Sequence, residues 1–413
     1  MNLGYSIYFG LESNAYLNKI YNAILDNHAI SLLGLSLNPV AINIDAALQF
    51  ADVLSKSNHP NPKIAESHKV WGQEIVAVLY EEDLTKPLEK RNPAIRTYLS
   101  SVLSSVGNYH GMHIKGLDHR NESVLDLSYS TFSKDVLRVP YIPKNEEEKF
   151  FFHSQRQAIE RFNDPYFSFS GPTSMGKSLV MQTFIKEQVH SGKKANLAII
   201  VPTKALINEM YHDLIAELKE VLVDKNYRVI SSAGALQLDF PHNFIFVLTP
   251  ERLLYLLIKK RKYNREIPID YLFIDEAHKI SSIKDSRSPF YYKNIDLLLR
   301  RPKKPHIIFA SPNIPNPQVY LGLIPDAKKL KHTLASAFSP VSQFKYFLDF
   351  IDGGVKVFNS HSQELRTITT DKIGNFNDML RRFYDKRSSS LVYVNNRDEA
   401  IVLYAFGCLC PRL

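Results

Sequence analysis

The central part of the chain alternates short apolar runs with longer amphipathic segments. The runs YFSFS (166–170), LAIIV (197–201) and YLFI (271–274) are rich in aromatic and β-branched residues. Between them lie segments whose apolar residues recur at helical spacing, such as KALINEMYHDLIAELKEVLVD (204–224). Strands that are apolar along most of their length need cover on both faces, and a parallel sheet between two layers of helices provides it. We therefore expect an α/β domain at 146–340.

The regions on either side of this block have a different character. Residues 1–140 contain amphipathic segments of helical spacing, such as 46–57, and no motif for nucleotide, metal or nucleophile chemistry. We expect them to form a mostly helical accessory domain, with a possible protein partner. A proline-containing, acidic stretch at 139–149 then serves as a linker. Residues 345–413 resemble the beginning of a further α/β domain, which we expect to be incomplete.

Composition excludes several classes of protein. The chain has 413 residues and is 45% hydrophobic, and its two cysteines, Cys408 and Cys410, are too few for a disulfide scaffold or a four-cysteine metal site. No apolar run reaches the ~18 residues of a membrane-spanning helix, and the first residues lack a secretory signal. We therefore expect a cytoplasmic protein without a membrane partner. The net charge of +9 favours a polyanionic partner but does not prove one.

Residues 171–178, Gly-Pro-Thr-Ser-Met-Gly-Lys-Ser, match the phosphate-loop pattern G-x-x-x-x-G-K-[ST] between a predicted strand and a predicted helix. Glycines allow the backbone N–H groups to face phosphate oxygens, and the following helix presents its positive end to them. Lys177 would reach the β- and γ-phosphates, and the Ser178 hydroxyl would bind Mg²⁺. The sequence has no Asn-Lys-x-Asp guanine signature, which argues against a GTPase. The expected nucleotide-binding residues in this loop are Gly171, Pro172, Thr173, Ser174, Met175, Gly176, Lys177 and Ser178.

Two adjacent carboxylates, Asp275 and Glu276, follow the apolar run 271–274. Functional groups of a parallel sheet gather at the carboxyl ends of its strands, so we expect this pair to lie beside residues 171–178. Asp275 would then bind Mg²⁺ together with Ser178, and Glu276 would orient and activate the attacking water. A lone Asp-Glu pair could equally be a solvated strand end, but the phosphate-loop match in the same block favours the catalytic interpretation.

These motifs and several others, in order along the chain, resemble the superfamily 2 helicases of the DEAD/DEAH-box type. Asp275-Glu-Ala-His278 resembles their motif II. Residues 152–159 resemble the Gln motif, with Gln155 rather than Gln157 in the position that reads adenine. The resemblance implies a RecA-like fold and an ATP-dependent helicase or translocase acting on DNA or RNA. It also implies that Lys177, Asp275 and Glu276 are the catalytic residues.

Two further segments are similar to the family's nucleic-acid-contacting motifs, Ia at 201–206 and Ib at 248–252. In each, a threonine next to a proline ends an apolar run, which places a hydroxyl and backbone N–H groups where a phosphate could be held. The expected nucleic-acid-binding residues are Pro202, Thr203, Lys204, Thr249 and Pro250. Residues 391–397 are similar to motif IV, which opens the family's second RecA-like domain. The phosphate loop and motif Ia are closer to Ski-type and repair helicases than to the DEAD-box RNA chaperones.

Motif III departs from the family pattern. The family has Ser-Ala-Thr, whose hydroxyls couple the nucleotide site to the strand-binding face, whereas this chain has Ser311-Pro-Asn313. Either Asn313 replaces the missing threonine or the coupling is altered. For His278, the last residue of motif II, we expect a packing or coupling role.

The sequence contains no Gln-x-x-Gly-Arg-x-x-Arg pattern, the family's motif VI, which carries the arginine fingers. An arginine finger contributes ~10³- to 10⁵-fold to phosphoryl transfer. We therefore expect a fragment or a frameshifted product, truncated within the second RecA-like domain, that binds ATP but hydrolyses it poorly without an arginine from elsewhere. The alternatives are a non-enzymatic module that binds ATP and nucleic acid or recruits partners, and a double-stranded-DNA translocase that does not separate strands.

Overall fold

The computed structural model describes residues 7–117, 150–232, 242–262, 268–281, 285–314, 316–325, 330–349 and 354–369. These residues fall into two compact units, which we describe separately. Unit 1 takes the described residues within Met1–Pro60, Trp71–Val102 and Ser342–Leu413, and unit 2 takes those within Asn61–Val70 and Leu103–Val341. Among the described residues, no helix combines the length and the apolar character that crossing a membrane requires.

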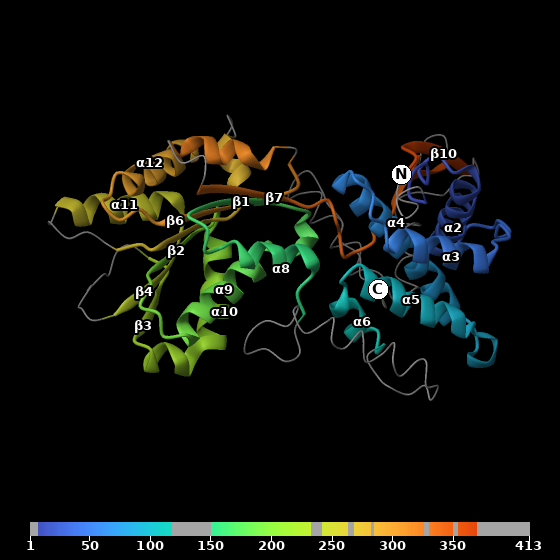
Figure 1. The fold of residues 1–413 in the computed structure, drawn as a ribbon, viewed down its shortest axis with the longest axis horizontal. Helices are drawn as coiled ribbons and strands as arrows, with labels where there is room; N and C mark the ends of the chain where they lie inside the picture. The colour runs from blue at the N-terminus through green and yellow to red at the C-terminus, as the bar shows by residue number, and fades with distance from the viewer. Residues whose placement is uncertain are drawn as a thin grey trace, which may run out of the picture. The chain divides into compact units, whose positions relative to one another are not determined.

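Unit 2 is built on a seven-stranded sheet (Figure 1). Its strands are β1 (Tyr166–Ser170), β2 (Leu197–Ile200), β3 (Tyr227–Ile230), β4 (Asn243–Leu248), β5 (Tyr271–Ile274), β6 (His306–Ser311) and β7 (Lys331–Ala335). Their order is β3-β4-β2-β5-β6-β1-β7, and every neighbouring pair is parallel. All the carboxyl ends therefore lie along one edge of the sheet.

Helices cover both faces of this sheet. The main ones are α8 (His153–Glu160), α9 (Lys177–His190), α10 (Lys204–Asp224), α11 (Pro250–Lys262) and α12 (Ser288–Leu299), with 3₁₀ turns η3 (Thr173–Met175), η4 (Ala277–Ser281) and η5 (Pro317–Leu323). The short helix α6 (Tyr109–Ile114) also belongs to unit 2. Figure 1 shows α9 and α10 on one side of the strands and α11 and α12 on the other. The predicted RecA-like α/β fold, with its parallel sheet and helices on both faces, is confirmed.

Alternate residues of the strands enter two separate cores, which explains why these strands are apolar throughout. In β2, Ile199 packs with α9 and α10, whereas its neighbour Ile200 packs with α11 and α12. In β5, Phe273 and Ile274 divide in the same way. Side chains of successive strand residues point to opposite faces, so a sheet covered on both sides favours apolar residues at most strand positions.

The helices of the N-terminal region are α2 (Ala15–Leu33), α3 (Ile44–Ser55), α4 (Pro62–Leu84) and α5 (Pro93–Ser105), with the 3₁₀ turn η1 (Leu88–Lys90). The predicted helical N-terminal region is therefore present. Most of it belongs to unit 1, although α4 begins and α5 ends among residues assigned to unit 2.

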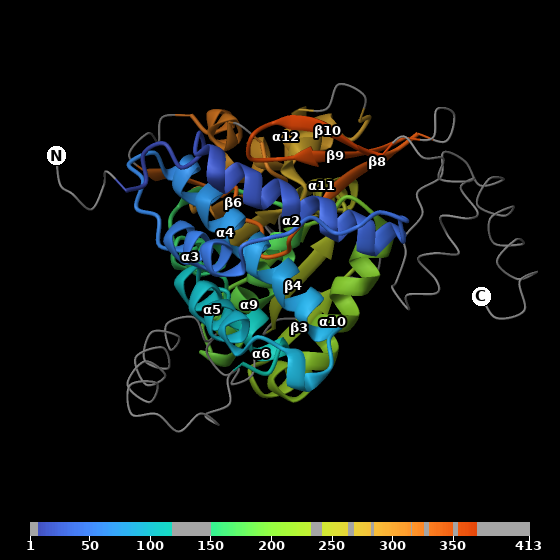
Figure 2. The same cartoon turned by 90° about the vertical axis from the view of Figure 1, so that its right-hand side faces the viewer.

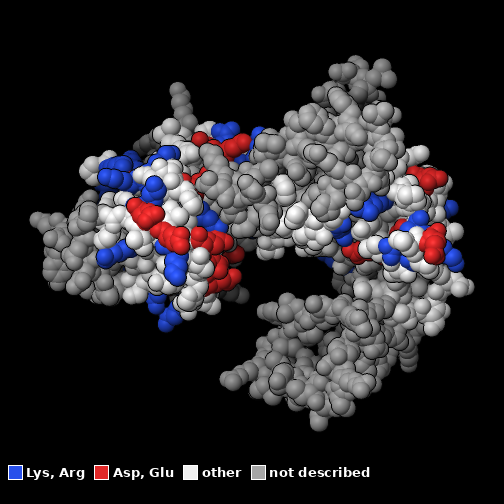
Figure 3. All heavy atoms as spheres, turned by 90° about the horizontal axis from the view of Figure 1, so that it is seen from below, with Lys and Arg blue, Asp and Glu red and all other residues white. Residues whose placement is uncertain are grey.

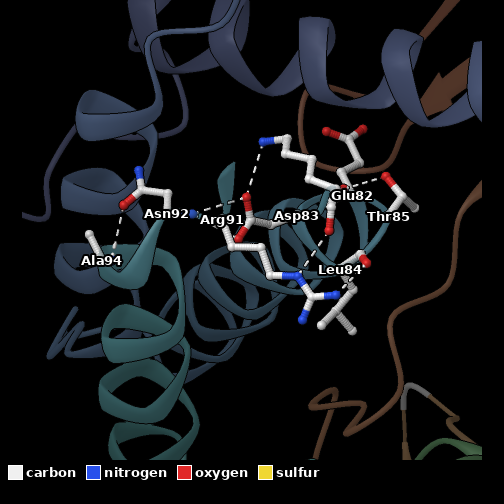
Figure 4. Close-up of polar contacts among 8 residues, drawn as sticks. Glu82, Asp83, Leu84, Thr85, Arg91, Asn92 and Ala94 are labelled. Atoms are coloured by element: carbon white, nitrogen blue, oxygen red, sulfur yellow. Dashed lines mark hydrogen bonds and ion pairs between the residues drawn. The ribbon is translucent and has the colours of Figure 1, made fainter. Parts of the chain in front are cut away.

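Polar contacts stabilise the connection between α4 and α5 (Figure 4). Arg91 Nη2 donates to Leu84 O at 2.9 Å, Asn92 N donates to Asp83 Oδ2 at 3.1 Å, and Asn92 Oδ1 accepts from Ala94 N at 3.0 Å. These bonds satisfy backbone groups that helix ends leave unpaired.

Unit 1 also contains a three-stranded antiparallel sheet of order β10-β9-β8, formed by β8 (Lys345–Leu348), β9 (Val355–Asn359) and β10 (Glu364–Thr369). Figures 1 and 2 show it beside α2. These strands are the described part of the region predicted to begin a second RecA-like domain. These strands are antiparallel and belong to the same unit as most of the N-terminal helices. This division differs from the three expected domains, 1–140, 146–340 and 345–413, which stay a prediction. The segment similar to motif IV, 391–397, lies outside the described residues.

A buried polar cluster joins this small sheet to the helices of unit 1. Glu74 Oε2 accepts from Tyr21 Oη at 2.6 Å and lies 2.8 Å from His361 Nε2. The His361 ring stacks on Trp71, with ring centroids 4.6 Å apart. Burial, followed by the charge of Glu74, raises the pKa of Tyr21 well above its usual value. Because the turn after β9 supplies His361, the sheet and helices α2 and α4 share one buried core.

Candidate functional site

The predicted site residues that follow strands lie at one edge of the unit 2 sheet. Residues 171–178 follow β1, 202–204 follow β2, 249–250 follow β4, 275–278 follow β5, and 311–313 lie at the end of β6. Because these strands are parallel, their carboxyl ends meet at the same edge. Segments that are far apart in the sequence therefore form one candidate site.

The loop Gly171–Ser178, here called the glycine loop, needs its two glycines for different reasons. A Cβ at Gly171 would collide with the Met175 side chain. Gly176 has φ +68°, and a Cβ there would lie 2.8 Å from Gln155 Nε2. Only glycine adopts this left-handed conformation without a steric penalty. The turn at Gly176 starts α9 at Lys177, so the N-terminus of that helix adjoins the loop.

Lys177 lies inside the glycine loop. Its ammonium donates to Gly171 O and to Pro172 O, both at 3.0 Å, and the residue is 6% exposed. Burial lowers the pKa of Lys177, and the charges of Glu276 and Asp275 oppose that shift. The ammonium thus interacts with loop carbonyls that an anionic ligand could replace as its partners.

Ser178 connects the glycine loop to motif II. Its hydroxyl donates to Asp275 Oδ2 at 3.2 Å. Asp275 Oδ1 accepts from Glu276 N at 2.9 Å, and Asp275 is only 5% exposed. The structure therefore brings together Lys177, Ser178, Asp275 and Glu276 as the sequence predicted. A hydroxyl and a carboxylate at this distance are hard oxygen donors of the kind that Mg²⁺ prefers.

The acid pair of motif II is held in an electrostatically costly arrangement. Burial, and then the neighbouring Glu276 charge, raise the pKa of Asp275, while hydrogen bonds from Glu276 N and Ser178 oppose the shift. Glu276 has φ +52°, a left-handed conformation that is unfavourable for a residue with a Cβ. His278 Nδ1 lies 3.1 Å from Glu276 Oε2, although not in hydrogen-bonding geometry. Strain of this kind is typical of functional sites.

We expect Asp275→Asn to stabilise the ligand-free protein at neutral pH. The raised pKa means that the folded state favours the protonated carboxyl, so stability falls as pH rises from the ordinary aspartate range through the raised value. The penalty is present above the raised pKa, and the asparagine removes it while it can still accept from Glu276 N and donate to Ser178. The gain should be on the order of 1 kcal/mol in denaturant unfolding at pH 7 and should disappear below about pH 4. A variant less stable than the wild type at pH 7 would contradict this account of Asp275.

Gln155, on α8, also contacts the glycine loop. Its Nε2 donates to Met175 O at 2.7 Å, its Oε1 accepts from Phe152 N at 2.8 Å, and the residue is 1% exposed. Gln157, the other possible register of the Gln motif, is exposed. The structure therefore brings Gln155 to the site, where its amide fastens the loop to the start of α8. Its reading of adenine stays a prediction.

The threonines of motifs Ia and Ib both cap helices. Thr203 Oγ1 accepts from Leu206 N at 3.3 Å at the start of α10. Thr249 Oγ1 accepts from Arg252 N at 3.4 Å at the start of α11. Thr203 is exposed, whereas Thr249 is 8% exposed. Each threonine therefore has a structural role, which is compatible with phosphate contact by the adjacent backbone but does not require it.

The other expected nucleic-acid-binding residues have different surroundings. Lys204 is exposed, whereas Pro202 and Pro250 are buried and use their carbonyls as acceptors, Pro250 O from Asn294 Nδ2 at 2.8 Å and Pro202 O from Arg287 Nη1. Among the described residues on the face drawn in Figure 3, a group of acidic side chains lies close together on the left-hand part, with basic side chains around it.

The region of motif III contains a hydroxyl that the sequence analysis overlooked. Ser170, at the end of β1, donates to Pro312 O at 2.8 Å and accepts from Ile314 N at 2.9 Å. Ser311 is fully buried and its hydroxyl has no hydrogen-bond partner among the residues that the structure describes, while Asn313 is exposed. The side chains of Ser311 and Asn313 thus differ in burial, and their coupling role stays a prediction.

Two further features near the site have no motif in the sequence. Glu66, on α4, accepts from Ser336 Oγ at 3.0 Å and from Ala337 N at 2.6 Å, and Ser339 Oγ lies 3.0 Å from Ser174 Oγ of the glycine loop. Arg287, just before α12, contacts the motif Ia segment. Each depends on long-range contacts, so no local pattern could have revealed it.

The fold and this site define a RecA-like α/β domain with a phosphate-loop sequence and an acid pair at the carboxyl edge of its sheet. Residues 152–319 match the model of the DEAD/DEAH box helicase family. Residues 152–319 are therefore similar to a DEAD/DEAH box helicase domain, in agreement with the resemblance that the motifs indicate.

Two solved structures resemble part of the chain. They are described as the DUF1998 helicase MrfA bound to DNA and as the same helicase bound to DNA and AMPPNP. The TM-scores are 0.36 and 0.35, the identities are 17% and 15%, and the matches cover 45% and 46% of this chain. The match spans 27% of each of those chains, well under two thirds of their length. A comparison with curated proteins gives no match.

Proposed function

We propose that this protein is an ATP-dependent nucleic-acid helicase or translocase, in which unit 2 binds ATP with Mg²⁺ and one strand of DNA or RNA. The observation that carries the proposal is the contact of Ser178 with Asp275, because it joins the glycine loop to the acid pair. Either motif alone could have a purely structural role. Both together at the carboxyl edge of a parallel sheet form the arrangement that phosphoryl transfer requires.

The residues present fit both ligands. A Cβ at Gly171 or Gly176 would collide with Met175 or Gln155, so glycine at these positions permits the compact loop, whose backbone N–H groups would face the phosphate oxygens. The N-terminus of α9 and the buried Lys177 supply positive charge at the same place. Ser178 and Asp275 supply the oxygen ligands for Mg²⁺, which would neutralise phosphate charge when bound.

Each residue then has a defined task. When ATP binds, the Lys177 ammonium donates to phosphate oxygens instead of the carbonyls of Gly171 and Pro172, and these charge-assisted hydrogen bonds hold the phosphates. Glu276 orients the attacking water and accepts its proton. Gln155 keeps the glycine loop against α8 and contributes to adenine recognition, and Ser311 with Asn313 and His278 couples this site to the strand-binding segments.

The nucleic acid would lie along the segments 202–204 and 249–250, held mainly through its phosphates. Backbone contact of this kind positions a strand without reading its sequence. The helical N-terminal region provides a further surface for a protein partner.

The direct test measures binding and turnover by the 413-residue protein. ATP should bind in a Mg²⁺-dependent manner, a single-stranded oligonucleotide should stimulate phosphate release, and a strand-displacement assay beside a triplex-displacement assay should distinguish a helicase from a double-strand translocase. Absence of ATP binding at any Mg²⁺ concentration would refute the proposal.

A second candidate is a module that binds ATP and nucleic acid, or recruits partners, without turnover. The observation in its favour is the departure from the family pattern at motif III, Ser311-Pro-Asn313, which lacks the threonine hydroxyl that would help to couple the nucleotide site to the strand-binding face. ATP binding with no stimulated phosphate release would support this candidate, whereas appreciable turnover by the protein alone would rule it out.

A further inference from the structure

Arg287 contacts both segments that are proposed to hold the nucleic-acid strand. Its Nη1 donates to Pro202 O in the segment after β2, and its Nε lies 3.3 Å from Glu251 Oε1. Glu251 is in the first turn of α11, directly after Thr249 and Pro250. One guanidinium thus links motif Ia with motif Ib.

The backbone of Arg287 is fixed from its own side. Arg287 N donates to Asp285 Oδ1 at 3.0 Å, and the next residue, Ser288, donates through its hydroxyl to Ile280 O. One turn further along α12, Tyr291 is fully buried in the core beneath α11 and α12. The backbone of Arg287 is therefore fixed, so its side chain can hold Pro202 and Glu251 in place.

The chemistry of this link is specific to arginine. A guanidinium presents several N–H groups in a rigid plane, so it can donate to a carbonyl and a carboxylate on different segments at once. A lysine ammonium is a point charge on a flexible stem and cannot reproduce that geometry. Both Arg287 and Glu251 are more than a third exposed, so the ion pair contributes little to overall stability.

We propose that Arg287 is a positioning residue that sets the spacing of motifs Ia and Ib, so that both can contact consecutive phosphates of one bound strand. The inference rests on the proposed function, since it concerns the strand-binding face of the same domain. It assigns to Arg287 the task of holding two protein segments, rather than that of neutralising phosphate charge itself.

The test compares Arg287→Ala, Arg287→Lys and Glu251→Ala by the binding of a fluorescent single-stranded oligonucleotide, DNA and RNA separately. We expect Arg287→Ala and Arg287→Lys each to weaken binding about tenfold, with ATP affinity changed less than about twofold. Glu251→Ala should also weaken binding, although it removes a negative charge and simple electrostatics predicts tighter binding. In Arg287→Ala, the slope of log affinity against log salt concentration should decrease by more than about 1, the decrease expected when a single phosphate contact is lost.

Arg300→Ala is the matched control, because Arg300 follows the other end of α12, pairs with Asp296 and is 72% exposed. It should leave oligonucleotide binding within about twofold, as a solvent-screened surface pair permits. Full retention of binding by Arg287→Lys, or tighter binding by Glu251→Ala, would overturn the inference and assign Arg287 to direct phosphate contact or to none. A wild-type protein that binds ATP but no oligonucleotide would instead refute the strand-binding part of the proposed function, so the two failures are distinguishable.

Discussion

Lys177→Ala should abolish ATP binding. The Lys177 ammonium is the buried cation of the glycine loop, 6% exposed and donating to Gly171 O and Pro172 O. Alanine removes the charge-assisted hydrogen bonds to phosphate and leaves no other lysine or arginine of the described glycine loop to replace them. We expect ATP affinity to fall by at least about 100-fold, the equivalent of roughly 3 kcal/mol, measured by equilibrium binding of a fluorescent ATP analogue with Mg²⁺.

The control for Lys177→Ala is Lys194→Ala. Lys194 is exposed and lies just beyond the end of α9, so its replacement makes the same change in charge near the same helix. It should leave ATP affinity unchanged. If Lys177→Ala kept full ATP binding or full ATPase activity, the proposed nucleotide site would be wrong.

Glu276→Gln should leave ATP binding intact and abolish its hydrolysis. The amide has nearly the same shape but cannot accept the proton of an attacking water, and general-base catalysis contributes about 10²- to 10⁴-fold. The bond from the residue 276 amide to Asp275 Oδ1 involves the backbone and survives the change. Phosphate release under single-turnover conditions, with saturating oligonucleotide, measures the loss directly.

Glu209→Gln serves as the matched control for Glu276→Gln. Glu209 is exposed on α10, so the same loss of charge occurs away from the acid pair. Its phosphate release should equal that of the wild type. Hydrolysis by Glu276→Gln at the wild-type rate would exclude Glu276 as the general base and require another acceptor for the proton.

Much of unit 2 could be predicted from local pattern. The apolar runs that include Ile199 and Phe273 form strands, as predicted, because a sheet covered on both faces favours apolar residues on either side. The glycine loop was equally recognisable, since a left-handed turn at Gly176 and a close approach at Gly171 both favour glycine. The adjacency of Ser178 and Asp275 followed from parallel topology alone.

Contacts with distant partners could not be predicted from the sequence. The role of Gln155 in reading adenine stays a prediction, but the bonds of its amide to Met175 O and Phe152 N are visible only in the structure. The sequence analysis overlooked Ser170, whose hydroxyl holds the turn from Pro312 to Ile314. Serine and glutamine are common in all environments, so their identity alone does not reveal which groups they meet.

Short-range spacing was therefore enough to specify the sheet, its helical cover and the residues that converge at its carboxyl edge, because each is governed by side-chain direction and backbone sterics within a few residues. Tertiary contacts alone assigned Arg287 to Pro202 and Glu251, and grouped the strands β8 to β10 with α2 and α4 around Glu74 and His361. Such pairings join residues tens to hundreds of positions apart. They depend on how complete elements pack, and no periodicity or motif within one segment encodes that.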